Sequence, residues 1–392
     1  MNAGELLDQI LIPRPNGSED LEKIANYLNT SLARHGAIVT EQSFTATPHG
    51  FQLMWIFAVS MIGAYCWATL SKRYMLALLI PVVLAAVLFL EFEHLVSTVS
   101  LLATAPERNI IGTWPGLAGG PTLIFTAHYD TTTHFGDHFS WGFWGKLQGP
   151  ATGLAITLAL AGLILQRKGK SIPLKIRLML LPFIAAPFVA MFWFQSIGPL
   201  VRTPSVGAID NGGSMASLLL LAQTLEKRPT NYPTTVKIVF LASEEERTLG
   251  SWAYAKSLAK TAKGKVDNIT VINLESIGTS EKLAYIPEDG FATKRYKSSD
   301  SMIRFINGAA QTVYGNKLEA RPLPFGTLTD GRSFLAHRIE AITLRSADSD
   351  EFPRQLHSEF DSKDRLSLTG LEKSAVMLNE MINQIDQAAV YR

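Results

Sequence analysis

The sequence predicts an α/β protein in which a mixed, mainly parallel sheet is covered by helices on both faces and is interrupted by two inserted apolar helical hairpins. Short apolar runs that read as strands alternate with segments of helical periodicity, which is the pattern of a largely parallel sheet. Four longer segments carry no charged residue, although 18% of the 392 residues are charged. Acidic and histidine residues recur just after the apolar runs, where the strands of such a sheet end.

The first predicted elements are a helix and two paired strands. The helix is expected after Ser18, because a capping serine is followed there by acidic residues and an apolar face, and Gly36 ends it. The strand Ala37–Thr45 comes next, and Asn109–Trp114 is predicted to be its partner. The first apolar hairpin would therefore be an insertion between two paired strands.

The rest of the predicted domain alternates between strands and helices. The expected strands are Thr122–Thr126, Val236–Ala242, Ile269–Leu274 and Ala341–Leu344. The expected helices are Ser214–Glu226, Leu249–Ala262 and Asp300–Tyr314, the last with Asp300 or Ser301 as its N-cap. Without the two hairpins about 290 residues remain, a size that suits one domain of this kind.

The four uncharged segments are predicted to cross a membrane. Each is close to the roughly 20 residues that a helix needs to span a bilayer. The alternative is a set of buried core helices, but a soluble core helix normally keeps a polar stripe, and these segments have little of one. The segments are Phe51–Leu70, Tyr74–Leu90, Leu147–Gln166 and Leu178–Leu200. We therefore expect transmembrane hairpins at 51–94 and 147–200, and one α/β domain built from 1–50, 95–146 and 201–392.

Basic links inside the hairpins predict the orientation. The first link is Ser71-Lys72-Arg73, and the second, 167–177, contains five Lys and Arg residues. Short loops rich in Lys and Arg stay in the cytoplasm, so the α/β domain is expected on the other side. In a bacterium it would face the periplasm from the inner membrane. The opening residues Met1–Glu5 do not resemble a signal peptide, so export would depend on the first hairpin.

Charge, cysteine count and aromatic content limit the kinds of binding partner that the protein is expected to have. The formal net charge is only +2, and the basic residues concentrate in the short links, so nothing favours a nucleic-acid partner. The single cysteine, Cys66, excludes an internal disulfide. The aromatic segment 135–144 is expected to form an interfacial belt or to line a substrate entrance. The lipid bilayer is thus the expected partner, and the sequence leaves the oligomeric state open.

Candidate site residues follow the predicted strands at one edge of the sheet. His128 and Asp130 come after Thr122–Thr126, and Glu275 comes after Ile269–Leu274. One imidazole nitrogen can bind a metal while Asp130 holds the other N–H. Taken singly, each residue reads equally well as an ordinary polar group at a strand end. Their shared position carries the argument, because ligands at the carboxyl ends of parallel strands converge on one crevice.

Further carboxylates and a second histidine complete the candidate set. Asp210 opens a glycine-rich turn before a helix, where it would cap the helix or bridge two metals with its two oxygens. Glu244 and Glu245 follow Val236–Ala242, so one can bind a metal while the other takes a proton from the attacking water. His357 lies in a loop. Two histidines and three carboxylates with a spare glutamate suit two divalent metals and a general base.

In their order these motifs resemble the zinc-dependent M28 peptidases, the family of bacterial leucyl aminopeptidases and glutamate carboxypeptidase-like enzymes. The resemblance covers the soluble part of the chain and not the hairpins. The matching motifs are His128-Tyr129-Asp130, Ala208-Ile209-Asp210-Asn211-Gly212, Glu244-Glu245 with Leu249-Gly250-Ser251, Asn273-Leu274-Glu275, Thr329-Asp330 and His357-Ser358.

The resemblance implies a zinc peptidase fold with two zinc ions. It implies that His128, Asp210 and Glu275 bind one zinc. The second zinc would be bound by Glu245, His357 and the same aspartate, which bridges the two ions. Its implied reaction is hydrolysis of a peptide substrate, with aminopeptidase activity as the expectation.

The same resemblance assigns the remaining roles. Glu244 would be the general base, and Asp130 would orient His128. The sequence departs from the family at Glu275, where Asp is common. It also departs at Glu246-Arg247-Thr248, where the family pattern Glu-Glu-x-Gly-Leu is not kept, so substrate contacts there are not implied.

Two other functions stay open at this point. Glutaminyl cyclisation, an acyl transfer with one zinc, is known on the same fold. A non-enzymatic membrane protein that binds or transports a metal or a peptide is the other alternative. The four apolar segments lack the ionisable residues that a transport pathway needs, and a full set of ligands is present. The residue preference and the choice between aminopeptidase and carboxypeptidase are not determined by the sequence.

Overall fold

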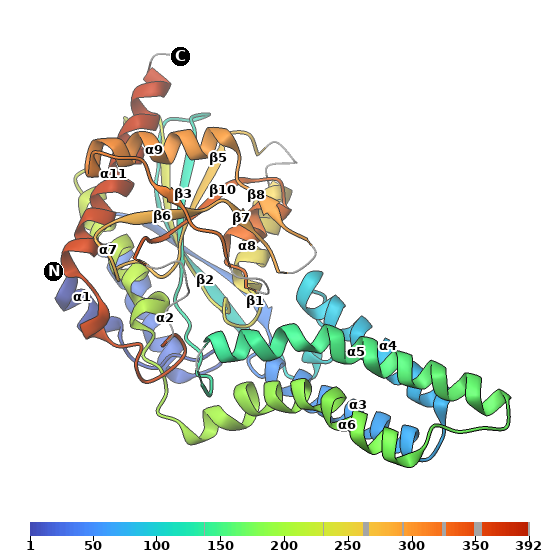
Figure 1. Ribbon diagram of the computed structural model, residues 1–392. Coiled ribbons are helices and arrows are strands. Elements are labelled where there is room, and N and C mark those ends of the chain that lie inside the picture. Colours follow the sequence, from blue (N-terminus) through green and yellow to red (C-terminus); the bar gives the residue numbers. More distant parts are fainter. Residues whose placement is uncertain are drawn as a thin grey trace. The chain divides into compact units, whose positions relative to one another are not determined.

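A computed structural model describes residues 1–136, 138–229, 231–261, 266–291, 294–323, 327–348 and 355–390. The chain forms two compact units, and Figure 1 shows the elements of both. The first unit is Met1–Pro48, Ala105–Thr132 and Pro204–Arg392, and the second is His49–Thr104 and Thr133–Thr203. Segments 95–104 and 133–146, which we expected in the α/β domain, thus lie in the second unit.

An eight-stranded mixed sheet organises the first unit, in the order β1-β2-β4-β3-β5-β10-β6-β9. Its four central strands, β4, β3, β5 and β10, are mutually parallel, while the pairs β1–β2, β2–β4 and β10–β6 are antiparallel. This confirms the predicted mixed sheet with a parallel centre. The strands are β1 (Ile38–Ala46), β2 (Ala105–Trp114), β3 (Thr122–His128), β4 (Thr235–Leu241), β5 (Ile269–Leu274), β6 (Leu283–Ile286), β9 (Glu319–Ala320) and β10 (Glu340–Ser346), with a separate pair β7 (Glu288–Asp289) and β8 (Tyr296–Lys297).

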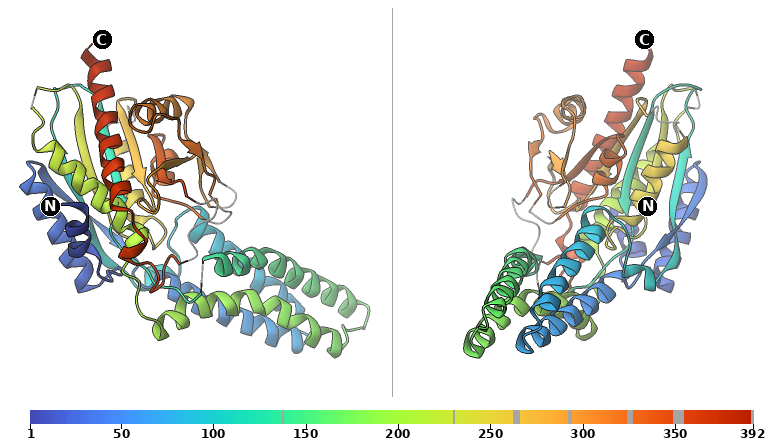
Figure 2. Two further views of the ribbon diagram at one scale, coloured as in Figure 1. Left: turned by 60° about the vertical axis from the view of Figure 1, so that its left-hand side comes forward. Right: turned by 90° about the vertical axis from the view of Figure 1, so that its right-hand side faces the viewer.

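Helices cover both faces of this sheet, as Figure 2 shows from two sides. Neighbouring residues of the central strands serve opposite cores: Phe125 packs into one apolar cluster and Ile124 into the other. Strands buried on both faces are therefore continuously apolar, which is why they could be recognised in the sequence. One face carries α1 (Ala3–Ile10), α2 (Glu19–Arg34), α7 (Gly213–Leu225), α9 (Asp300–Tyr314) and α11 (Leu368–Val390), and the other carries α8 (Leu249–Thr261) and α10 (Gly331–Ala336).

The boundaries of several elements agree with the sequence prediction, and one cap does not. β5 and α9 begin and end at the predicted residues, whereas Ala262, the expected end of α8, lies outside the described residues. The N-cap of α9 is Ser299 and not Asp300 or Ser301, because Ser299 has extended backbone angles and its hydroxyl accepts the N–H of Met302 at 3.2 Å. The acidic Asp300 then lies in the first turn, where a carboxylate favours the helix dipole.

The second unit is built from long apolar helices: α3 (Gly50–Leu70), α4 (Tyr74–Glu93), α5 (His138–Arg167) and α6 (Leu174–Phe192), with short helical turns at Ser100–Leu102, Trp193–Ile197 and Gly198–Val201. Four segments in the described part of the chain are long and apolar enough to cross a membrane, namely Gly50–Leu70, Tyr74–Glu93, Gly142–Arg167 and Leu174–Val201. The buried Arg177 caps α3, because its guanidinium donates to the carbonyl oxygens of Thr69 and Leu70 at 2.9 and 2.6 Å.

The aromatic segment 135–144 also belongs to the second unit. Phe135 lies 5.7 Å from Trp193 between ring centroids, and Phe143 packs edge-on against Trp144. The side chains of Phe139 and Trp141 lie outside the described residues.

Candidate metal centre

The candidate residues lie at the carboxyl ends of the parallel strands. His128 is the last residue of β3, and Glu275 directly follows β5. Glu244 and Glu245 follow β4 after a short link. Because β3 pairs in parallel with both β4 and β5, the carboxyl ends of these three strands lie at the same edge of the sheet. The structure thus brings together residues that are far apart in the sequence.

Asp210 reaches this edge from a short turn, Ala208–Gly212, that leads into α7. The carboxylate of Asp361 accepts the main-chain N–H groups of Ile209 and Asp210 at 2.5 and 3.3 Å. Burial raises the pKa of Asp361 to about 7, and these two N–H groups oppose the rise. Asp361 therefore holds one side of the turn in place, a role that the sequence did not predict for it.

The other side of the turn is fastened to the end of β5. The amide of Asn211 donates to the carbonyl oxygen of Leu274 at 2.9 Å and accepts the N–H of Ser276 at 3.2 Å. A Cβ atom on Gly213 would come within 2.0 Å of the Ile277 carbonyl oxygen, so only glycine allows this close approach. Asp210 is consequently fixed relative to Glu275, the residue between Leu274 and Ser276.

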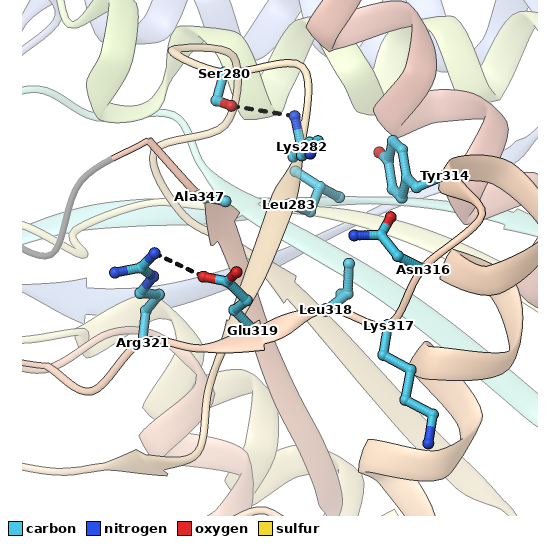
Figure 3. Close-up of a pocket in the computed structure, with 10 residues that line it drawn as sticks. All are labelled: Ser280, Lys282, Leu283, Tyr314, Asn316, Lys317, Leu318, Glu319, Arg321 and Ala347. Atoms are coloured by element: carbon cyan, nitrogen blue, oxygen red, sulfur yellow. Dashed lines mark hydrogen bonds and ion pairs between the residues drawn. The ribbon is translucent and has the colours of Figure 1, made fainter.

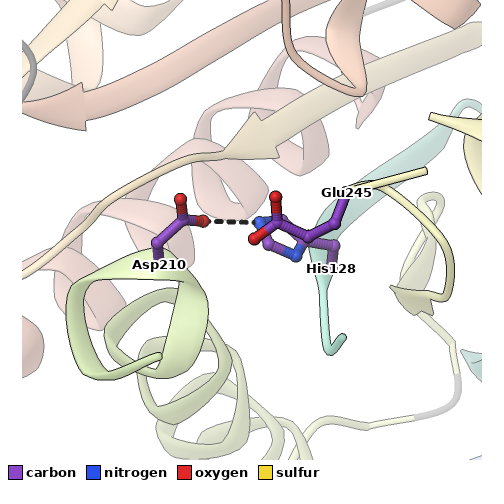
Figure 4. Close-up of side chains that lie close together, drawn as sticks. All are labelled: His128, Asp210 and Glu245. Atoms are coloured by element: carbon purple, nitrogen blue, oxygen red, sulfur yellow. Dashed lines mark hydrogen bonds and ion pairs between the residues drawn. The ribbon is translucent and has the colours of Figure 1, made fainter. Parts of the chain in front are cut away.

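The candidate ligands form two groups that share Asp210. In the first group, Nε2 of His128 lies 2.9 Å from Oδ1 of Asp210 and 3.6 Å from Oε1 of Glu275. In the second, Nε2 of His357 lies 3.0 Å from Oδ2 of Asp210 and 3.1 Å from Oε2 of Glu245. Figure 4 shows His128, Asp210 and Glu245, whose ligand atoms all lie within 4.8 Å of one another. Asp210 therefore presents a different oxygen to each imidazole.

The electrostatics of this cluster favour a bound cation. Burial lowers the pKa of His128, but the surrounding carboxylates, above all Glu275, outweigh burial and raise that pKa well above its usual value. The same balance, with Glu245 as the main carboxylate, raises the pKa of His357. Burial raises the pKa of Asp210, but the two imidazoles outweigh it and hold the pKa far below its usual range. The cluster thus attracts protons, and a divalent cation is the alternative source of positive charge.

The donor set also fits zinc. Two ligands at 2.0–2.1 Å from a tetrahedral zinc lie about 3.3 Å apart, and the four N–O separations above range from 2.9 to 3.6 Å. Oε1 of Glu245 and Oε2 of Glu275 are buried, and the described residues offer neither of them a hydrogen-bond partner. Buried carboxylate oxygens are normally hydrogen-bonded or bound to a metal. A metal ion would satisfy these two oxygens.

Asp130 makes more contacts than the sequence indicated. Its carboxylate oxygens accept the N–H groups of Glu244 and Glu245, each at 3.1 Å. Nδ1 of His128 lies 3.2 Å from the main-chain oxygen of Asp130 and 3.5 Å from its Oδ1. The same carboxylate therefore faces His128 and fixes the backbone of both glutamates.

Glu244 and Asp330 are two further carboxyl groups with raised pKa values. Burial raises the pKa of Glu244 well above its usual value; His128 opposes this rise, and Glu275 and Asp330 add to it. Asp330, at the start of α10, is fully buried, and none of the described residues donates a hydrogen bond to its oxygens within the usual distance. Burial raises its pKa to about 7, opposed by His128 and by the hydroxyl of Ser251. The sequence pointed to Asp330 only as part of a motif and gave it no role.

A separate pocket lies away from these residues. Figure 3 shows its lining, which comes from β6, β9 and the end of α9 and includes none of the candidate ligands. In this pocket Arg321 forms an ion pair with Glu319 at 2.7 Å, so these two lining charges neutralise each other.

Comparison with solved structures gives the fold. A leucine aminopeptidase precursor from Bacteroides thetaiotaomicron shares 16% identity, with 97% of this chain and 94% of that chain covered and a TM-score of 0.54. A zinc aminopeptidase from Bacillus subtilis shares 14%, with 98% and 94% covered and a TM-score of 0.55. A glutaminyl cyclase from an Acidobacteriales bacterium shares 14%, with 98% and 94% covered and a TM-score of 0.55. The chain is therefore similar in fold to peptidases and cyclases alike.

Sequence comparison finds a family match for part of the chain. No curated protein matches the chain. The sequence model of peptidase family M28 matches residues 193–382, the range that contains Asp210, Glu244, Glu245, Glu275 and His357. Residues 193–382 therefore match peptidase family M28, the family that the order of the motifs indicated.

Proposed function

We propose that this protein is a membrane-anchored peptidase, most simply an aminopeptidase, whose site binds two zinc ions. The observation that carries the proposal is the position of Asp210, whose two oxygens lie 2.9 Å from His128 and 3.0 Å from His357. Each histidine has a second carboxylate beside it, Glu275 in one group and Glu245 in the other. A carboxylate shared by two complete ligand groups is what a pair of metals requires.

In this proposal Glu244 is the general base. Zinc ions held by the two groups would lower the pKa of a water molecule and polarise the carbonyl group of the substrate. Glu244 accepts a proton from the attacking water and later delivers it to the leaving amine. Asp130 holds the main-chain N–H groups of Glu244 and Glu245, so it sets the position of the base and of the neighbouring ligand together.

Glutaminyl cyclisation is the second candidate. Solved glutaminyl cyclases match the fold as well as aminopeptidases do, with TM-scores of 0.55 for both. A cyclase acts on an N-terminal glutamine and needs no attacking water, whereas a peptidase needs the base and the water. The presence of two ligand groups, one around His128 and one around His357, favours the peptidase, because a single zinc would leave one group without a role.

A panel of three peptides separates these candidates: one with a free N-terminus, the same peptide acetylated, and one that begins with glutamine. We expect the purified full-length protein to release the first residue of the free peptide and to leave the acetylated peptide intact. Chelation should abolish the release, and added zinc should restore it. Cyclisation of the glutamine peptide without hydrolysis of any peptide would contradict the peptidase proposal and support the second candidate.

Glu275→Asp is expected to keep a measurable part of the hydrolytic activity. Shortening the side chain by one methylene moves the carboxylate back by about 1.5 Å, from a position 3.6 Å from Nε2 of His128. A neighbouring water or a small shift of the turn can absorb part of that distance. Glu275→Ala is the matched variant and should lose activity and zinc content. Parental activity in Glu275→Ala would show that Glu275 is not a ligand.

We also propose that the four apolar helices span a membrane with the site on the side away from the cytoplasm. The basic links Lys72–Arg73 and 167–177 resist translocation, and each hairpin returns the chain to the side that it left. Cysteine labelling in intact cells tests this after Cys66→Ala. A probe cysteine at Ser71 should be protected and one at Lys363 should be labelled. The reverse result would place the site in the cytoplasm, and labelling at both positions would show that the hairpins do not span.

A further inference from the structure

A buried arginine near the beginning of the chain joins two of the segments that carry the candidate ligands. The guanidinium of Arg14 donates through Nε to the carbonyl oxygen of Tyr129 at 2.6 Å. It also donates through Nη1 to the carbonyl oxygen of Val206 at 2.6 Å, and through Nη2 to that of Gly207 at 3.1 Å. Tyr129 lies between His128 and Asp130, and Gly207 immediately precedes the turn that holds Asp210.

The main chain around Arg14 strengthens the same connection. Its N–H donates to the hydroxyl of Thr131 at 2.9 Å, and its carbonyl oxygen accepts the N–H of Thr131 at 3.2 Å. Two residues later, the amide of Asn16 donates to Oδ2 of Asp130 at 2.8 Å and accepts from the hydroxyl of Ser243 at 3.0 Å. Segment 14–16 therefore contacts the chain after β3, after β4 and before α7.

The chemistry of arginine suits this place. A guanidinium has several donors in one rigid plane, so it can hold carbonyl groups of two chain segments at a fixed separation, which the single ammonium of lysine cannot do. Burial lowers the pKa of Arg14 to about 10, and the carboxylates of Asp361, Asp130, Asp210 and Glu245 oppose that change. The group thus stays charged at neutral pH and places a fixed positive charge beside the acidic cluster.

We propose that Arg14, assisted by Asn16, is a positioning residue that sets the separation between His128 and Asp210 and so tunes the affinity of the site for zinc. This inference rests on the metal centre of the proposed function. Neither residue is one of the candidate ligands; Arg14 contacts main-chain groups and Thr131, and Asn16 contacts Asp130 and Ser243. Changing the groups that orient metal ligands typically lowers metal affinity by about 10- to 100-fold.

The test compares Arg14→Lys, Arg14→Met and Asn16→Ala with a control, Arg228→Met. Arg228 is also mostly buried, and it donates to the carbonyl oxygen of Thr234 and to Asp386, at the opposite end of β4. Zinc affinity is measured by competition with a chelator, and thermal unfolding of the metal-free proteins reports their stability. We expect zinc affinity about 10- to 100-fold weaker in both Arg14 variants, and a smaller loss in Asn16→Ala. Arg228→Met should lose stability at unchanged zinc affinity.

Each outcome is decisive because stability and affinity are measured separately. Parental zinc affinity in the folded Arg14 and Asn16 variants would overturn this inference and leave the proposed function intact. If neither Arg14 variant folds, Asn16→Ala decides, because Asn16 is only half-buried and its truncation removes just the contacts to Asp130 and Ser243. A parent protein that binds no zinc would overturn both proposals.

Discussion

Replacing Asp210 by alanine is expected to remove both zinc ions and all measurable hydrolysis. The carboxylate lies 2.9 Å from the imidazole of His128 and 3.0 Å from that of His357, so its loss deprives both ligand groups at once. It also leaves two buried imidazoles without their common acceptor. Elemental analysis of the purified variant measures the effect, and we expect metal content near zero.

His357→Ala is the matched control for this substitution. His357 belongs to only one group, with Asp210 and Glu245, so its loss should remove mainly one zinc ion. The two variants together distinguish a bridging ligand from an ordinary one. Full metal occupancy in Asp210→Ala would show that this carboxylate does not bridge.

Glu244→Gln is expected to lower the rate of hydrolysis by about 100- to 10,000-fold, the usual effect of losing a general base. Glutamine keeps the size of the side chain but cannot accept the proton from water. The main-chain N–H of Glu244, which donates to Asp130 at 3.1 Å, is not changed by the substitution. Zinc content should therefore stay close to that of the parent.

The matched variant is Glu245→Gln, at the neighbouring residue. Oε2 of Glu245 lies 3.1 Å from His357, so this change should reduce the zinc content. Kinetic assays combined with elemental analysis separate the two glutamates. If Glu244→Gln lost as much zinc as Glu245→Gln, the roles of base and ligand would be assigned incorrectly.

The sequence was sufficient to predict the centre of the fold and insufficient at its edges. β3 and β5 were predicted because strands buried on both faces are continuously apolar, and Ile269–Leu274 agrees at both ends. β6 and β9 were missed because they have only four and two residues, too few to show a pattern. α11 was also missed, although Leu371, Leu378 and Ile382 recur at helical spacing and would have predicted it.

The sequence likewise predicted some residues of the candidate site and missed others. His128, Asp210 and Glu275 could be selected because each stands where a strand or a turn reaches the same edge of the sheet. Asp361 and Arg14 could not, because they act on main-chain groups. Asp361 holds the N–H of Ile209, 152 residues away, and Arg14 holds the carbonyl oxygen of Val206, 192 residues away. No residue pattern marks a side chain whose partners are distant backbone atoms, so only the fold reveals these contacts.

The metal requirement of hydrolysis tests the central claim most directly. Zinc is removed from the full-length protein by chelation, and measured amounts are added back while release of the first residue from a free peptide is followed. We predict that the metal-free protein is inactive and that activity rises until two zinc ions are bound per chain. Full hydrolytic activity with one zinc ion per chain, or hydrolysis by the metal-free protein, would contradict the proposed dinuclear site.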